Sequence, residues 1–79
     1  MNNETNKTDL STLANSWPSA FVARHKVGEF TGGIVTPGYL ANMDNCTVDG
    51  VPGRFRCGRK IIYPVAELIQ WLEKRCEVI

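Results

Sequence analysis

The sequence predicts a small α+β domain that consists of three helices and a β-hairpin. Three observations lead to this fold class: a helix-start signal in the middle of the chain, two β-prone runs on either side of a two-residue turn, and a long helical period near the end. The chain has 79 residues, of which 43% are hydrophobic, so one domain with a small core is expected. It has no apolar run of the roughly 18–20 residues that a membrane-spanning helix needs.

Residues 1–16 are predicted to form a mobile N-terminal arm ahead of a folded domain over residues 17–79. They are rich in Asn, Thr and Ser and have few apolar side chains, so burial cannot offset the entropy that is lost when they become ordered. A helical turn over residues 10–13 is the only ordered element expected in the arm. The arm also lacks the basic flank and apolar stretch of a signal peptide, so we expect a cytoplasmic protein.

The first helix of the domain is predicted over residues 24–31. Val27 and Phe30 are three residues apart and therefore share one helical face. Gly32 and Gly33 follow, and glycine readily adopts the positive φ of a residue that ends a helix. We therefore expect the chain to turn at this pair of glycines.

A second helix is predicted over residues 37–44, where the chain has its clearest helix-start signal. Thr36 suits the N-cap position, and Pro37 suits the first helical position because its missing N–H costs no hydrogen bond there. Leu40 and Met43 would form the buried side. The exposed side would carry Gly38, Tyr39 and Asn42.

A β-hairpin is predicted after a loop that is rich in turn-forming residues. Its strands are residues 54–57 and 60–63, and the Gly-Arg pair between them suits a type II′ turn, which has glycine first. Because side chains alternate along a strand, Phe55 and Cys57 would lie on an apolar inner side. The cationic outer side would carry Arg54 and Arg56.

The last helix is predicted from Pro64 onward. Apolar residues recur there at the helical spacing i, i+3, i+4, i+7 and i+11, which is the strongest period in the chain. They are Val65, Leu68, Ile69, Leu72 and Cys76. Two helices joined by a glycine turn, followed by a hairpin and a further helix, make a small winged helix-turn-helix domain, with the hairpin as the wing.

This architecture and the charge pattern predict that the chain binds double-stranded DNA. An α-helix fits the major groove, and its N-terminal residues usually reach the base edges. In the second helix, Asn42 could pair with adenine, and Tyr39 could contact a phosphate or a thymine methyl group. Four cations and no acid lie within residues 54–60, and arginines there suit phosphate or minor-groove contacts. The candidate DNA-binding residues are Arg24, Lys26, Thr36, Gly38, Tyr39, Asn42, Arg54, Arg56, Arg59 and Lys60.

The sequence argues against an enzyme and against a metal site. It has no Ser/His/Asp or Cys/His constellation and no glycine-rich phosphate loop. Cys46, Cys57, Cys76 and the single histidine, His25, are too dispersed for the usual four-ligand zinc site. We therefore expect no catalytic residue, no metal and no cofactor. A small protein–protein adaptor module without DNA binding remains open as the alternative function.

Five short motifs occur in order along the chain: VGEFTGG at residues 27–33, TPGYLAN at 36–42, PGRFRCGRK at 52–60, YP at 63–64 and WL at 71–72. The series lies within residues 20–76 and resembles the excisionase-like branch of the MerR-type winged helix-turn-helix superfamily. That branch includes phage and prophage excisionases and the small AlpA-type prophage regulators. The resemblance implies DNA binding, with the second helix in the major groove and the wing against the backbone or the minor groove.

The expected function is therefore that of a sequence-specific double-stranded DNA-binding protein. It would act as a phage or prophage excisionase (a recombination directionality factor) or as a related transcription regulator. Both roles need a reading helix and a wing, so the sequence leaves them as alternatives. The expected partners are duplex DNA, an integrase or other recombinase, and further copies of the chain bound cooperatively on DNA. No membrane contact is expected.

Overall fold

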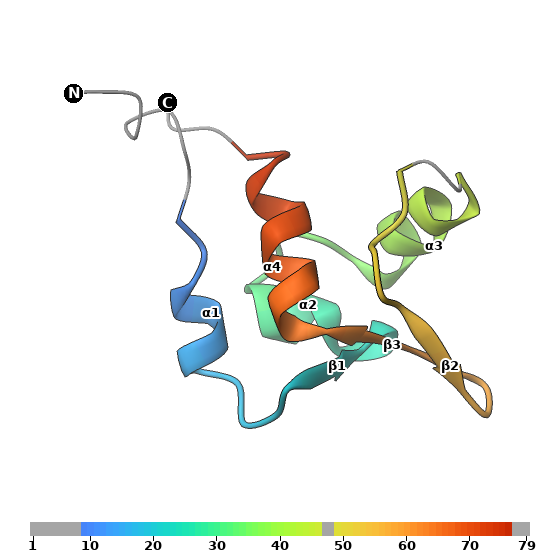
Figure 1. Cartoon of the computed structure of the whole chain (residues 1–79), viewed down its shortest axis with the longest axis horizontal. Helices are drawn as coiled ribbons and strands as arrows, with labels where there is room; N and C mark the ends of the chain where they lie inside the picture. Colours follow the sequence, from blue (N-terminus) through green and yellow to red (C-terminus); the bar gives the residue numbers. More distant parts are fainter. Residues whose placement is uncertain (1–8, 47–48, 77–79) are drawn as a thin grey trace.

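Three short strands form one antiparallel sheet, and helices cover one of its faces (Figure 1). The computed structural model describes residues 9–46 and 49–76. Along the chain the elements are α1 (Thr12–Asn15), β1 (Phe21–Ala23), the 3₁₀ helix η2 (Arg24–Lys26), α2 (Val27–Thr31), α3 (Pro37–Asn45), β2 (Phe55–Cys57), β3 (Lys60–Pro64) and α4 (Val65–Glu73). The predicted α+β class is confirmed, with one strand more than the predicted hairpin.

The first predicted helix is present as two consecutive segments, η2 and α2. Val27 and Phe30 of α2 are both buried, as their spacing predicts. The helix ends at Gly32, whose φ of 69° lies in the left-handed region that glycine adopts most readily. Gly33 then donates its N–H to the Gly28 carbonyl at 2.9 Å. The two glycines therefore end this helix as predicted.

The second predicted helix is α3, which extends one residue beyond the predicted end. Thr36 is its N-cap, because the side-chain Oγ1 accepts a hydrogen bond of 3.1 Å from the Tyr39 N–H. Leu40 is fully buried, and Met43 is half-buried against the core. The helix therefore lies on the domain through the side that the sequence predicts.

The last predicted helix is α4, which begins at Val65 with Pro64 as its N-cap. Its buried face consists of Val65, Leu68, Ile69, Trp71 and Leu72. Cys76, the last residue of the predicted period, follows the end of the helix and is half-buried. The Trp71 indole Nε1–H donates a 2.8 Å hydrogen bond to the Asp49 carbonyl, which attaches the loop before the hairpin to α4.

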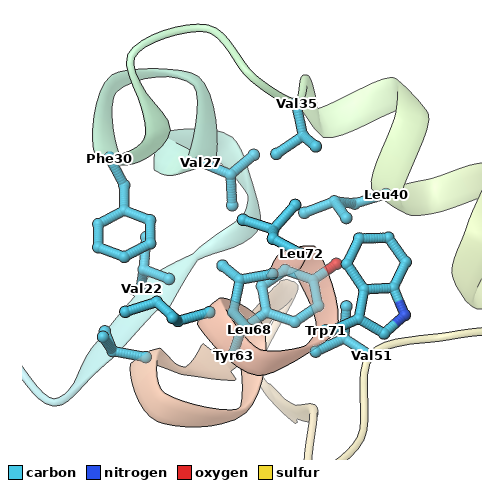
Figure 2. Close-up of a cluster of buried hydrophobic side chains, with 12 residues drawn as sticks. Val22, Val27, Phe30, Val35, Leu40, Val51, Tyr63, Leu68, Trp71 and Leu72 are labelled. Atoms are coloured by element: carbon cyan, nitrogen blue, oxygen red, sulfur yellow. The ribbon is translucent and has the colours of Figure 1, made fainter. Parts of the chain in front are cut away.

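A cluster of buried side chains fills the space between the sheet and the helices (Figure 2). It consists of Val22, Val27, Phe30, Val35, Leu40, Val51, Tyr63, Val65, Leu68, Ile69, Trp71 and Leu72. Every helix of the domain except α1 and η2 contributes, and Val51 comes from the loop before the hairpin.

Among residues 9–46 and 49–76, no helix is long and apolar enough to cross a membrane.

The sheet contains the predicted hairpin and an additional edge strand. β2 and β3 are antiparallel and leave Gly58 and Arg59 as a two-residue turn. Gly58 has a φ of 62°, and no non-glycine residue in the described part of the chain has a positive φ, which matches the predicted type II′ turn. β1 pairs with the other side of β3 through Val22 and Tyr63, so the strand order is β1-β3-β2.

The predicted faces of β2 are wrong. Val22 and Tyr63 are cross-strand partners and both are buried, so they mark the face that the helices cover. Cross-strand partners share a face and neighbours along a strand alternate, so Phe55, the partner of Ile62, lies on the opposite face. Phe55 is 40% exposed, and Cys57 is exposed. The predicted apolar inner side fails because the pairing of β2 with β3 places Phe55 opposite Ile62, on the face away from Tyr63. From the sheet, Val22 of β1 and Tyr63 of β3 fill the core instead.

Part of the segment assigned to the mobile arm contacts the domain. Leu10 and Leu13 are half-buried against the core, and the Leu10 N–H donates a 2.7 Å hydrogen bond to Glu73 Oε2 on α4. Leu13 belongs to α1, which begins two residues later than the expected turn. Residues 1–8 of the predicted arm lie outside the described residues, and the domain boundary at residue 16 stays a prediction.

Candidate functional site

A cationic groove lies between three segments that are distant in the sequence. Its walls come from η2, from the start of α3 and from the β2–β3 hairpin, and its volume is about 190 Å³. The residues that line it are Arg24, His25, Pro37, Arg59, Lys60 and Ile61. None of these described residues is acidic, so the groove presents positive charge. The fold thus brings Arg24 close to Arg59 and Lys60, which are candidate residues from two distant segments of the sequence.

Two further predicted cations are neighbours of residues that line the cationic groove. Arg56 is exposed and pairs across strands with Ile61, so it shares a sheet face with a residue of the groove. Lys26 follows His25 in η2, and its Nζ lies 3.6 Å from Glu29 Oε1. Both side chains of this pair are exposed, and such surface pairs contribute at most about 1 kcal/mol. Lys26 can therefore exchange this partner for another anion at little cost.

The outward side of α3 is a stripe of Gly38, Asn42 and Asn45, called the outer stripe below. The spacing i, i+4, i+7 places them on one helical face, and all three are exposed. The outer stripe adjoins the cationic groove, because the groove residue Pro37 immediately precedes Gly38. Asn45 was not among the predicted site residues, although extending the helical period by three residues from Asn42 identifies it.

Thr36 and Tyr39 lie on a different side of α3, beside α4. They line a second groove of about 470 Å³, together with Ile34, Val35, Leu72, Arg75 and Cys76. The rings of Tyr39 and Trp71 meet edge to face with their centroids 6.3 Å apart. The fold therefore does not bring these two predicted site residues to the cationic groove.

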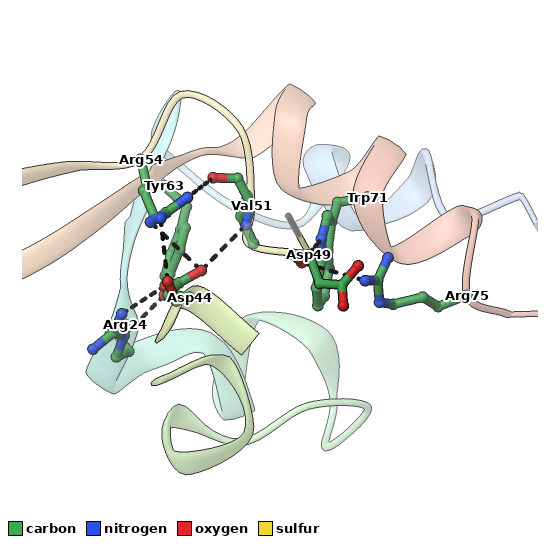
Figure 3. A network of polar contacts seen from close by, with 8 residues as sticks. All are labelled: Arg24, Asp44, Asp49, Val51, Arg54, Tyr63, Trp71 and Arg75. Carbon is green, nitrogen blue, oxygen red and sulfur yellow. Dashed lines mark hydrogen bonds and ion pairs between the residues drawn. The ribbon is translucent and has the colours of Figure 1, made fainter. Parts of the chain in front are cut away.

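Asp44, in the last turn of α3, is the centre of a polar network that the sequence analysis missed (Figure 3). Its side chain is only 6% exposed. Oδ2 accepts hydrogen bonds of 2.6 Å from both Arg24 and the Tyr63 hydroxyl, and Oδ1 accepts one of 3.2 Å from the Val51 N–H. A signal was available, because Asp44 is four residues after Leu40 and so shares its buried face.

Arg24 and Arg54 have intramolecular partners in this network. The Arg24 Nε–H also donates to the Tyr63 hydroxyl oxygen at 2.9 Å. Arg54 donates to the carbonyl oxygens of Val51 at 2.9 Å and Asp44 at 3.3 Å, and its Nε is 3.6 Å from Asp44 Oδ1. These contacts attach the loop before the hairpin to α3. Of the two predicted DNA contacts, Arg24 also lines the cationic groove, whereas Arg54 is not among its lining residues.

The pKa values of Tyr63 and Arg24 are both raised in this network. Burial of Tyr63, together with the hydrogen bond from its hydroxyl to Asp44, raises the pKa of Tyr63 to about 12. Burial alone would lower the pKa of Arg24, but its hydrogen bonds with Tyr63 and Asp44 raise it overall. A neutral phenol and a charged guanidinium therefore face the carboxylate, and the network acts as a structural support.

The chemistry that the site offers is recognition. The cationic groove supplies positive charge, and the outer stripe supplies amide donors and acceptors, which suits a polyanion with exposed hydrogen-bonding edges.

In the part of the chain that the structure describes, no group of three or more His, Cys, Asp or Glu side chains could hold a metal ion. Cys46 and Cys57 are exposed and Cys76 is half-buried, all as free thiols.

Comparison of the chain with protein-family models, with curated proteins and with solved structures gives no match.

Proposed function

We propose that the protein binds double-stranded DNA sequence-specifically, as a small winged helix-turn-helix domain. In this arrangement α2 and α3 form the helix-turn-helix unit, α3 enters the major groove, and the β2–β3 hairpin is the wing. The observation that carries the proposal is the cationic groove, because it joins the start of α3 to the wing through Arg59 and Lys60. Phosphates border the major groove of a duplex, so these cations can contact the backbone while α3 contacts the bases.

The inward direction of Asp44 supports the proposal. Asp44 is the only acidic residue of α3, and Arg24 and Arg54 hold its carboxylate on the side that faces the domain. An outward carboxylate would repel the phosphates of an approaching duplex. The outer stripe is instead uncharged and can approach base edges without the desolvation of a charge.

The resemblance to excisionase-like proteins suggests two roles for such a domain. The protein would act as a phage or prophage excisionase, with an integrase or other recombinase as its partner, or as a related transcription regulator. One small unit makes few contacts, so several copies would bind together on the DNA. A footprint across the attachment site of the element and its own promoter separates the roles. Protection at the attachment site supports the excisionase, and protection at the promoter alone supports the regulator.

Titration of a fluorescently labelled duplex at several salt concentrations tests the proposal. The cations of η2 and the wing should neutralise about four to six phosphates, so log K should fall with log salt at a slope of about −3.5 to −5.5. Lys74→Ala removes an exposed cation at the end of α4 and serves as the matched control, with an unchanged slope. Absence of binding, or an affinity that does not depend on salt, would refute the proposed cationic interface with DNA.

The second groove supports an alternative function, a protein–protein adaptor without DNA binding. The groove includes Ile34 and Tyr39, which are 47% and 43% exposed and offer apolar contact to another protein. Chromatography on heparin or immobilised duplex at low salt separates the two functions. A DNA-binding protein is retained on such a column, whereas an adaptor elutes early.

A further inference from the structure

The outer stripe of α3 begins with a glycine that the fold does not require. Gly38 lies in the first turn of α3, and a Cβ added there would meet no other part of the described chain within 4 Å. Its φ is not among the positive values of the described glycines. Alanine favours a helix more than glycine does, so neither backbone conformation nor internal packing explains a glycine at this position.

The two amides of the outer stripe have the chemistry and spacing to recognise adenines. Asn42 and Asn45 are both exposed on the same face. They are about 4.5 Å apart along the helix axis at 1.5 Å per residue, close to the 3.4 Å between bases along a DNA strand. An asparagine side chain can pair with adenine through two hydrogen bonds. Its NH₂ group donates to N7, and its carbonyl oxygen accepts from the N6 amino group.

We propose that the outer stripe recognises two neighbouring adenines in the major groove, with Asn42 paired to one and Asn45 to the other. Gly38 lets the start of α3 approach the DNA closely enough for both amides to reach the bases. The inference rests on the proposed function, since it specifies which bases α3 reads. The cationic groove beside the outer stripe supplies the phosphate contacts, which are independent of sequence.

Selection of duplexes from a randomised library by the full chain gives the probe for the test. The selected sites should share two neighbouring adenines on one strand. Each adenine is then replaced in turn by 7-deaza-adenine, which keeps Watson–Crick pairing but lacks the N7 acceptor. Each replacement should weaken binding about 10-fold, the effect expected from loss of one good base contact. The same replacement at an adenine outside the pair is the control and should leave the affinity unchanged.

Asn42→Ala and Asn45→Ala assign each amide to its base. Each variant should bind the selected duplex about 10-fold more weakly. Each should also lose its sensitivity to 7-deaza-adenine at one of the two positions and keep it at the other. Gln70→Ala removes an exposed amide on α4 and is the matched control, which should keep both the affinity and the sensitivity of the original chain.

Gly38→Ala separates a role in DNA approach from a role in folding. The variant should have a higher thermal midpoint, because alanine favours the helix. It should nevertheless bind the selected duplex about 5-fold more weakly or worse, because the added methyl group lies between α3 and the DNA. A variant that binds at full strength would overturn the role assigned to Gly38.

The outcomes separate this inference from the proposed function. Steep salt-dependent binding without selected adenines, or with equal affinity for the 7-deaza duplexes, would overturn the inference and leave the proposed function standing. Absence of salt-dependent duplex binding would overturn both.

Discussion

The Tyr63 hydroxyl donates a 2.6 Å hydrogen bond to Asp44 Oδ2 and so joins β3 to the last turn of α3. Tyr63 is fully buried. Arg24 in η2 and Arg54, the residue before β2, both contact the same carboxylate. Together the four side chains fix the orientation of α3 on the sheet. Because Asp44 is directed inward, the opposite side of α3, with the outer stripe, faces solvent.

Asp44→Ala should destabilise the domain by about 3 kcal/mol, because two arginines and the Tyr63 hydroxyl lose their shared partner. Urea unfolding followed by tryptophan fluorescence measures the change. Asp49→Ala is the matched control, since Asp49 uses its backbone carbonyl to bind Trp71, and it should change stability by less than about 0.5 kcal/mol. Similar small losses in both variants would contradict the role of Asp44.

Stability should decrease in alkaline solution as Tyr63 loses its proton. The pKa of Tyr63 is about 12 in the folded protein, against a reference value of 10.0. The unfolded chain therefore releases this proton first, so the contribution of Tyr63 is complete below pH 10 and is lost as the pH rises through 12. Tyr63→Phe should be less stable at neutral pH by about 1–2 kcal/mol, because the Asp44 carboxylate loses a donor.

Urea unfolding between about pH 9 and about pH 11.5 checks this dependence. The original chain should lose more stability over the range than Tyr63→Phe, which has no phenol at this position to titrate. Parallel losses in the two proteins would show that the alkaline effect arises elsewhere.

Removal of residues 1–16 should leave a cooperative unfolding transition and lower the stability by about 1–2 kcal/mol. The loss is expected because Leu10 and Leu13 are half-buried against the core and Leu10 is bonded to Glu73. A chain that begins at Asp9 keeps these contacts and should lose less than about 0.5 kcal/mol. Thermal melts of the two truncated chains measure both effects. A non-cooperative melt of the shorter chain would show that the arm is part of the domain.

Local signals in the sequence predicted most of the helices and the hairpin. Thr36 and Pro37 marked the start of α3, because an N-cap and a proline act within a single turn. Gly58 marked the turn of the hairpin, because its positive φ is a property of one residue. The α4 period was visible for the same reason, since its buried residues repeat within one short segment.

Features that depend on distant contacts were not visible. β1 has three residues, too few to show alternation, and it is a strand because Val22 pairs with Tyr63. The candidate site was predicted in part for the same reason. Arg59 and Arg54 were both predicted to bind DNA because of their charge. Only the fold shows that Arg59 is exposed on the turn, whereas Arg54 is hydrogen-bonded to Asp44.

The salt dependence of duplex binding by an Arg59→Ala/Lys60→Ala double variant tests most directly whether the wing contacts the DNA backbone, as the proposed interface requires. Both residues line the cationic groove and are exposed. The double variant should bind every duplex more weakly, with a slope of log K against log salt that is less steep by about 2. Lys74→Ala should keep the original slope, and circular dichroism should show an unchanged fold in both variants. A double variant with the original slope would contradict the proposed interface.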